Sequence, residues 1–118
     1  MKVMRLNEGE TYQPDPGWKR VSLAGSPLVS IEYFEKPPHH ASPLHHHEQE
    51  QVCVVLKGRM RATGGNDIAV DLDSGDSVWF AAHESHRIEN LGQETAIGLD
   101  IFAPARSFSF WKDRPVST

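Results

Sequence analysis

The sequence is poor in cysteine and in long apolar runs, and each shortage excludes a class of protein. Cys53 is the single cysteine among 118 residues, so the chain cannot form an internal disulfide, which suits a reducing compartment. The first ten residues hold no apolar block of the kind that a signal peptide needs. The apolar runs, such as Val52 to Leu56, are too short to span a bilayer. We therefore expect a cytoplasmic protein with no membrane partner.

Clustered positive charge is also lacking. Lys and Arg number 12 against 16 Asp and Glu, and no run of basic residues forms a stripe, so we expect no nucleic-acid partner. Hydrophobic residues at 38% and charged residues at 24% are typical of one folded domain. We expect a single domain over 1–118, with an N-terminal arm at 1–17 and a C-terminal tail at 107–118 whose aromatic residues need burial.

Proline and glycine interrupt the whole chain, and the segments between them are short and rich in Val, Ile, Leu, Phe and Trp. This rhythm predicts many short strands joined by turns, and no window shows a sustained helical period. A jelly roll or a related double-sheet barrel fits such a pattern. The expected strands are 18–23, 28–34, 51–56, 59–63, 68–72, 77–80, 86–90 and 95–102.

Histidine is unusually frequent, with seven residues, five of which lie between His39 and His47. On a strand, residues two apart point the same way, so His45 and His47 present two imidazoles to one face while His46 faces away. Gln51 shares their parity if the strand stays regular. Such a pair could begin a metal site, but a third imidazole from elsewhere in the chain is needed.

Two stretches of the chain match spaced motifs. In G-x5-H-x-H-x3,4-E-x6-G, the last four fixed positions are taken by His45, His47, Gln51 and Gly58. In G-x5-P-x-G-x2-H-x3-N, the matching positions are Gly75, His86 and Asn90. This pair of motifs resembles the cupin superfamily over roughly residues 39–106. The resemblance implies an all-β, single-domain jelly-roll (double-stranded β-helix) barrel that holds one metal ion through His45, His47, Gln51 and His86.

The sequence departs from these motifs at three places. His39 stands where the first motif begins with Gly, and Ala81 and His83 replace the Pro and Gly of the second. Histidine is found fairly often at positive φ, so the second turn can survive. Gln51 replaces the usual Glu, and its uncharged amide leaves the full charge of the ion in place, which favours an anionic ligand. The ligand set suits a divalent transition metal (Ni, Fe, Zn, Mn or Cu) without choosing among them.

The expected strand at 95–102 presents two different faces. Ile97, Leu99 and Ile101 form an apolar face that we expect in the core, whereas Ala96, Gly98, Asp100 and Phe102 form a face that suits a cavity wall. The run Asp100, Phe102, Pro104 and Arg106 is similar to a segment of KdgF-type cupins of pectin and alginate breakdown, which convert 4,5-unsaturated monouronates to linear ketones. The resemblance implies that Asp100 and Arg106 are the catalytic residues, with Asp100 as the acid/base group, and that Phe102 and Arg106 bind the substrate, Arg106 through the substrate carboxylate.

Several alternatives stay open at this point. Asp100 and Arg106 could form a structural salt bridge, and Phe102 could be simple core packing. The favoured activity is an isomerase or lyase type of reaction on a small anionic sugar acid, because a carboxylic acid, a metal and an arginine suit proton transfer on an unsaturated uronate. A metal-dependent dioxygenase and a non-catalytic sugar- or metal-binding module are the alternatives. The resemblance also implies a homodimer.

Overall fold

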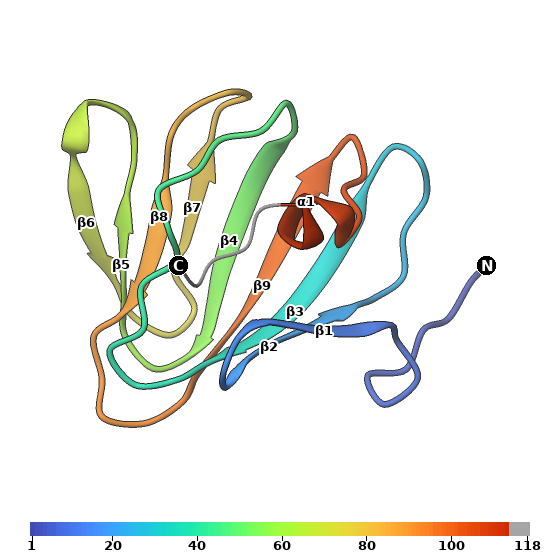
Figure 1. The fold of residues 1–118 in the computed structure, drawn as a ribbon, viewed down its shortest axis with the longest axis horizontal. Coiled ribbons are helices and arrows are strands. Elements are labelled where there is room, and N and C mark those ends of the chain that lie inside the picture. The colour runs from blue at the N-terminus through green and yellow to red at the C-terminus, as the bar shows by residue number, and fades with distance from the viewer. Residues whose placement is uncertain (114–118) are drawn as a thin grey trace.

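The computed structural model describes residues 1–113, which form two antiparallel β-sheets, as Figure 1 shows. One sheet has six strands in the order β1-β2-β3-β9-β4-β7, and the other has three in the order β6-β5-β8. The strands are β1 Thr11–Asp15, β2 Trp18–Ser22, β3 Ser30–Lys36, β4 Glu50–Lys57, β5 Met60–Thr63, β6 Ala69–Leu72, β7 Ser77–Phe80, β8 Arg87–Asn90 and β9 Ala96–Ala103, with a 3-10 turn η1 at Gly65–Asp67 and a helix α1 at Ser109–Lys112.

The two sheets do not close into a barrel, so the expected barrel is corrected to an open jelly-roll sandwich. The segment before β4 shows one physical reason. It runs beside the chain of β8 but meets it only in isolated bridges, Ala41 with Glu89 and His45 with His86. Pro43 lies between these bridges and has no N–H to donate, so a continuous ladder cannot form there.

All eight expected strands are present, with boundaries that differ by up to two residues. The expected arm at 1–17 is corrected in part, because Thr11–Asp15 is strand β1 and pairs with β2. Pro14 is tolerated because β1 is an edge strand, and the backbone groups on its outer edge need no hydrogen-bond partner from another strand.

The core lies between the sheets, and strand β9 contributes to it with the face opposite to the one expected. Ala96, Gly98, Asp100 and Phe102 are buried, whereas Ile97, Leu99 and Ile101 are half-buried and point to the outer side of the six-stranded sheet. The interior side therefore carries the polar residue, because the interior holds the candidate site as well as the core. The core cluster consists of Phe34, Cys53, Val55, Met60, Ala62, Leu72, Phe80, Ile88 and Ala96.

Gly98 is packed against its neighbours so closely that a side chain has no room. A Cβ built there would lie 2.5 Å from the Phe34 ring and 2.9 Å from the carbonyl oxygen of Val54. We expect Gly98→Ala to lower the free energy of unfolding by about 1–3 kcal/mol in denaturant titrations, because overpacking forces a core ring and a backbone to shift. Gly92→Ala is the control, since its Cβ would meet nothing closer than 3.4 Å. Equal stability of both variants would contradict this packing.

The C-terminal tail folds back over the interior, as expected from its aromatic residues. Phe108, Phe110 and Trp111 are buried, and Phe110 and Trp111 form a second apolar cluster with Trp18. Figure 1 shows α1 in front of β9 and β3. The part of the predicted tail at 114–118 lies outside the described residues.

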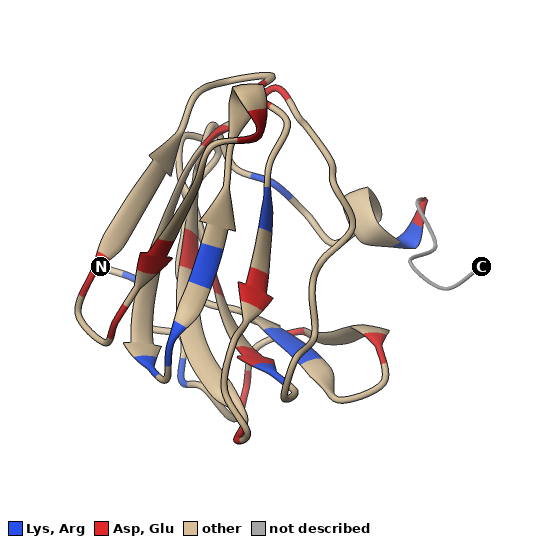
Figure 2. Ribbon diagram, turned by 90° about the vertical axis from the view of Figure 1, so that its left-hand side faces the viewer, with Lys and Arg blue, Asp and Glu red and all other residues tan. Residues whose placement is uncertain are grey.

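Figure 2 shows that Lys and Arg are interspersed with Asp and Glu along the strands visible in that view. Within residues 1–113, the structure has no helix that is both long enough and apolar enough to cross a membrane.

Candidate metal centre

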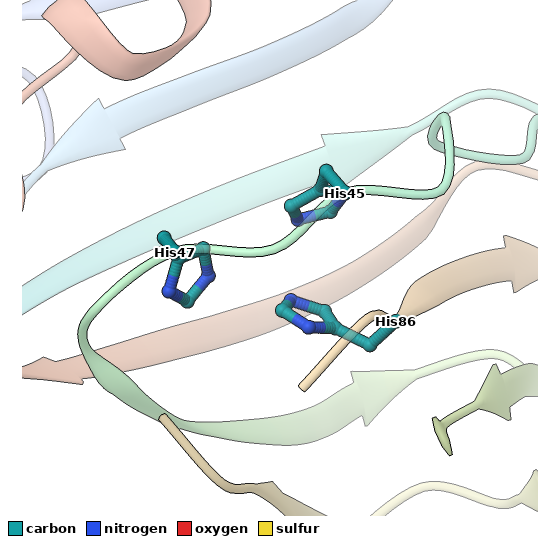
Figure 3. Close-up of side chains that lie close together, drawn as sticks. All are labelled: His45, His47 and His86. Atoms are coloured by element: carbon teal, nitrogen blue, oxygen red, sulfur yellow. The ribbon is translucent and has the colours of Figure 1, made fainter. Parts of the chain in front are cut away.

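Three imidazoles from two distant stretches of the chain converge inside the sandwich, as Figure 3 shows. His45 and His47 lie on the segment that leads into β4, and His86 directly precedes β8. One ring nitrogen of each histidine lies within 4.8 Å of the others. The backbone fixes this approach, because the amides of His45 and His86 each donate a hydrogen bond to the other's carbonyl, at 3.1 and 2.9 Å.

Gln51 joins this cluster from the start of β4. Its Oε1 lies 3.0 Å from Nε2 of His47 and 2.9 Å from Nε2 of His86. Its Nε2 donates to Oδ1 of Asp100 at 3.0 Å, and a carboxylate can only accept. Asp100 therefore fixes the amide so that its oxygen, not its nitrogen, faces the imidazoles.

Each histidine is oriented through its other ring nitrogen. The Nδ1 atoms lie 2.7 Å from the carbonyl of Pro43 for His45, 3.0 Å from that of Gln49 for His47 and 2.8 Å from that of Glu84 for His86. A carbonyl only accepts, so each Nδ1 carries the proton. A neutral imidazole has one N–H, and each Nε2 then offers a lone pair. Backbone anchoring of the non-ligating nitrogen is the usual arrangement around metal-bound histidines.

The convergence of lone pairs is what makes the cluster fit a cation. Burial lowers the pKa of His45 to about 2 and that of His47 to about 4, aided by neighbouring positive groups, so neither ring carries a second proton at neutral pH. The unprotonated Nε2 atoms of His47 and His86 therefore point their lone pairs at Oε1 of Gln51, which also carries lone pairs. Three imidazole nitrogens and an amide oxygen around one point can hold a divalent transition metal and leave positions open for another ligand.

A buried chain of charges continues from Gln51 to the end of the protein. Asp100 accepts a hydrogen bond from Nη2 of Arg20, whose Nε donates to Glu32 at 2.7 Å. Arg106 donates to the same Glu32 from Nε at 3.3 Å and from Nη2 at 3.1 Å. All four side chains are less than 10% exposed. The alternative of a direct Asp100–Arg106 salt bridge is not found, since each group has another partner within residues 1–113.

The charge of Asp100 depends on Arg20. Burial acts to raise the pKa of Asp100, but the charge and hydrogen bond of Arg20, together with the charge of Arg106 and a hydrogen bond from Cys53, outweigh it and hold the pKa below its ordinary value. Asp100 is therefore an ionised carboxylate in the interior, able to accept a proton. Burial raises the pKa of Cys53, which is 0% exposed beside Gln51 on β4, so the thiol is a buried apolar group as expected.

The sequence analysis missed Arg20, Glu32 and Lys36, all of which point inward. Strand parity could have found them, because Arg20 is two residues from the buried Trp18, and Glu32 and Lys36 flank the buried Phe34 at the same spacing. Polar residues at core parity on two neighbouring strands are the signal of a polar interior.

The remaining histidines take different places. His46 and His39 are exposed, as expected, whereas His40 is half-buried with Nε2 2.9 Å from Asp15. His39 and His83 both have positive φ, 60° and 67°, at the two positions where the motifs have glycine. The expected survival of the second turn is confirmed, and His83 also lines a surface hollow.

Helix α1 covers the histidine cluster. Phe110 lies 5.4 Å from the His47 ring, and Trp111 lies 4.9 Å from the His45 ring. Beneath them an inner cavity of about 20 Å³ remains, bordered by His45, Gln51, His86, Asp100 and further residues of β2 and β3. Outside them lies an open hollow of about 490 Å³, bordered by His47 and Phe110. Arg106 reaches both spaces, and its guanidinium lies 3.8 Å over the buried ring of Phe102.

Two facing antiparallel sheets with three inward histidines on the expected motif positions agree with the resemblance that the sequence motifs carry. The family model described as Cupin domain matches residues 32–102, more than half of the chain. The chain therefore belongs to the cupin family. No sequence among curated proteins matches it significantly.

Solved structures similar to this chain share its fold at low sequence identity. KdgF from Halomonas sp. is 20% identical with a TM-score of 0.83, over 92% of this chain and 98% of that one. An RmlC-like cupin from Shewanella frigidimarina is 21% identical with a TM-score of 0.80, over 91% and 94%. A formate complex of oxalate decarboxylase from Lactobacillus farciminis is 18% identical with a TM-score of 0.80, over 92% and 35%. The chain is thus a small cupin that resembles KdgF in fold.

Proposed function

We propose that His45, His47, Gln51 and His86 hold one divalent transition metal, and that the chain is an enzyme that opens the ring of 4,5-unsaturated monouronates to the linear ketone. One observation carries the proposal: an ionised carboxylate, Asp100, lies 3.0 Å from the amide of Gln51, and all four candidate metal-site residues are uncharged. Such a site keeps the full charge of the ion beside a base, which suits an anionic substrate that must transfer a proton.

The reaction is an isomerisation, and its protons balance within the substrate. A base removes the proton of the anomeric hydroxyl, the bond between C1 and the ring oxygen breaks, and its electron pair passes to the ring oxygen. The resulting enolate takes a proton at C4 and becomes a ketone at C5. Asp100 is the group that accepts the first proton and returns it at C4. A bound metal supplies positive charge that stabilises the oxygen anion formed on ring opening.

Arg106 and Phe102 contribute to substrate binding in this proposal. Nε and Nη2 of Arg106 are occupied by Glu32, while its buried Nη1 has no partner in the described part of the chain and is free to donate to the substrate. The ring of Phe102 packs against the guanidinium of Arg106 in a cation–π contact. The oxalate decarboxylase of similar fold is a formate complex, and formate is a small carboxylate, which supports an anionic ligand. The homodimer stays a prediction.

An assay on an unsaturated monouronate tests the proposal, because the double bond absorbs ultraviolet light and is lost on ring opening. We expect the metal-loaded protein to accelerate the loss of absorbance, and Asp100→Asn to slow it on the order of 100-fold with metal content unchanged. Asp71→Asn is the control, since Asp71 is a surface partner of Arg61. Decay at the rate of buffer alone, with metal bound, would refute the ring-opening activity.

A further inference from the structure

The inner cavity is lined by hydrogen-bond donors that have no acceptor. Trp18 Nε1, Trp111 Nε1 and Arg106 Nη1 are buried without a partner in the described chain, and all three residues border this cavity. A buried donor left unsatisfied costs about 1–3 kcal/mol. Three such groups around one space indicate a ligand that brings acceptors.

Lys36 brings an amino group that can carry a positive charge to the same cavity. It is 1% exposed and takes no part in the ion pairs that the neighbouring carboxylates of Glu32 and Asp100 form within residues 1–113. Its described contact is the face of the Trp18 ring, 4.1 Å from Nζ to the ring centroid. A cation–π contact offsets only part of the cost of burying a charge, and buried charges are otherwise paired.

The charges around the cavity do not balance without a ligand. The two carboxylates, Glu32 and Asp100, already pair with Arg20 and Arg106, which cancels two negative against two positive charges. A protonated Lys36 then has no ion-pair partner among these groups. Because the candidate metal-site residues are uncharged, a bound divalent ion would add further positive charge.

We propose that Lys36 is the carboxylate-binding residue of the inner cavity, pairing with the carboxylate of a small sugar acid that occupies the space between Lys36 and the metal centre. This inference rests on the proposed function for the class of substrate and adds the group that recognises its charge. Lys36 then binds the substrate carboxylate instead of Arg106, whose Nε and Nη2 already donate to Glu32. Arg106 Nη1 and Trp18 Nε1 supply further hydrogen-bond donors to the ligand.

A whole sugar acid reaches Lys36 only when α1 is displaced. About 20 Å³ is room for one water molecule, far less than a monosaccharide needs. Trp111 borders the inner cavity and Phe110 borders the outer hollow of about 490 Å³, and Arg106 reaches both. Moving these two rings joins the spaces into one pocket of the size usual for small-molecule ligands.

The protonation of Lys36 responds to such a ligand. Burial and the charge of Arg20 lower its pKa to about 7, against the raising effects of Asp100, Cys53 and Asp15. A bound carboxylate raises the pKa again, so binding takes up a proton above pH 7 and is tighter at pH 6 than at pH 8. The titratable or charged groups that act on Lys36 or border the same cavity are Asp15, Arg20, His40, His45, Cys53, His86, Asp100 and Arg106.

Calorimetric titration with D-galacturonate, a saturated uronate that cannot undergo ring opening, tests the inference on the metal-loaded protein. Lys36→Met removes the charge and keeps an unbranched chain over Trp18. We expect it to weaken galacturonate binding about tenfold or more, since hydrogen bonds to charged groups are the strong ones. Lys57→Met, an exposed lysine at the end of β4, is the control and keeps wild-type affinity. Neutral D-galactose should bind both variants as it binds wild type.

A second measurement needs no variant. Titrations of the wild-type protein at pH 8 in two buffers of different ionisation enthalpy should show uptake of about one proton for each galacturonate bound. No uptake, wild-type affinity in Lys36→Met, or no binding of galacturonate by the wild type would each overturn the role of Lys36. None of these outcomes depends on turnover, so they are separate from a failure of the ring-opening assay.

Discussion

His86→Ala is expected to remove the metal from the protein. His86 supplies one of three clustered imidazoles, and without it two imidazoles and an amide oxygen remain, which is too few for a stable site in a chain with no charged ligand there. We expect metal affinity to fall by more than about 100-fold, beyond the roughly 10–100-fold that loss of an outer-sphere partner costs. Metal content after purification and dialysis, measured by mass spectrometry, checks this.

The matched control is His46→Ala, one residue from two candidate ligands. His46 is exposed and is not one of the three clustered histidines, so its loss leaves the metal content unchanged. Because His86 stacks on Phe80 at 4.3 Å, His86→Ala also opens a space in the interior. His47→Gln is the second variant, since it keeps most of the volume. Full metal content in both ligand variants would contradict a site at this place.

Arg20→Met is expected to destabilise the fold by about 3–5 kcal/mol, which is a large part of the 5–15 kcal/mol that holds a domain folded. Arg20 is the middle of the buried charge chain and pairs with both Glu32 and Asp100. Removing it leaves Asp100 charged, buried and without an ion-pair partner within residues 1–113. Denaturant unfolding followed by circular dichroism measures the loss.

Arg61→Met is the control for the type of substitution. Arg61 also pairs with a carboxylate, Asp71, at 2.7 Å, but this pair lies on the surface between β5 and β6. Exposed pairs contribute little, so this variant should unfold almost as the wild type does. If Arg20→Met were equally neutral, the buried chain would carry no net stabilisation and would need another explanation.

The strands and the pairing of His45 with His47 could be predicted because each depends on local information. Turn residues fix where strands end, and a period of two places His45 and His47 on one face. The approach of His86 could not be predicted from spacing alone, because it depends on backbone hydrogen bonds between His45 and His86, which are 41 residues apart in the sequence. The family motifs supplied that link. The approach of His86 to His45 and His47 could thus be predicted from the family resemblance but not from residue spacing.

The prediction for β9 was right in placing Asp100 beside a cavity and wrong in placing the other face in the core, and the error has a physical reason. Hydrophobicity places Ile97, Leu99 and Ile101 inside, but the interior of this fold also holds polar groups, and the strand turns Asp100 toward them. The partners that make this favourable, Arg20 and Glu32, come from strands far away in the sequence. The sequence of β9 alone cannot show that Asp100 has an ion-pair partner on another strand.

The aromatic cover gives the protein a built-in optical reporter. The indole of Trp111 rests 4.9 Å from the His45 ring and 4.9 Å from Trp18, so two fluorophores sit at the edge of the candidate metal centre. Paramagnetic ions such as Ni²⁺ and Cu²⁺ quench nearby indole emission. Trp79, the third tryptophan, is 58% exposed on β7 and contributes a constant background that Trp79→Phe removes. Loading of the centre and displacement of α1 can thus be followed in real time without any label.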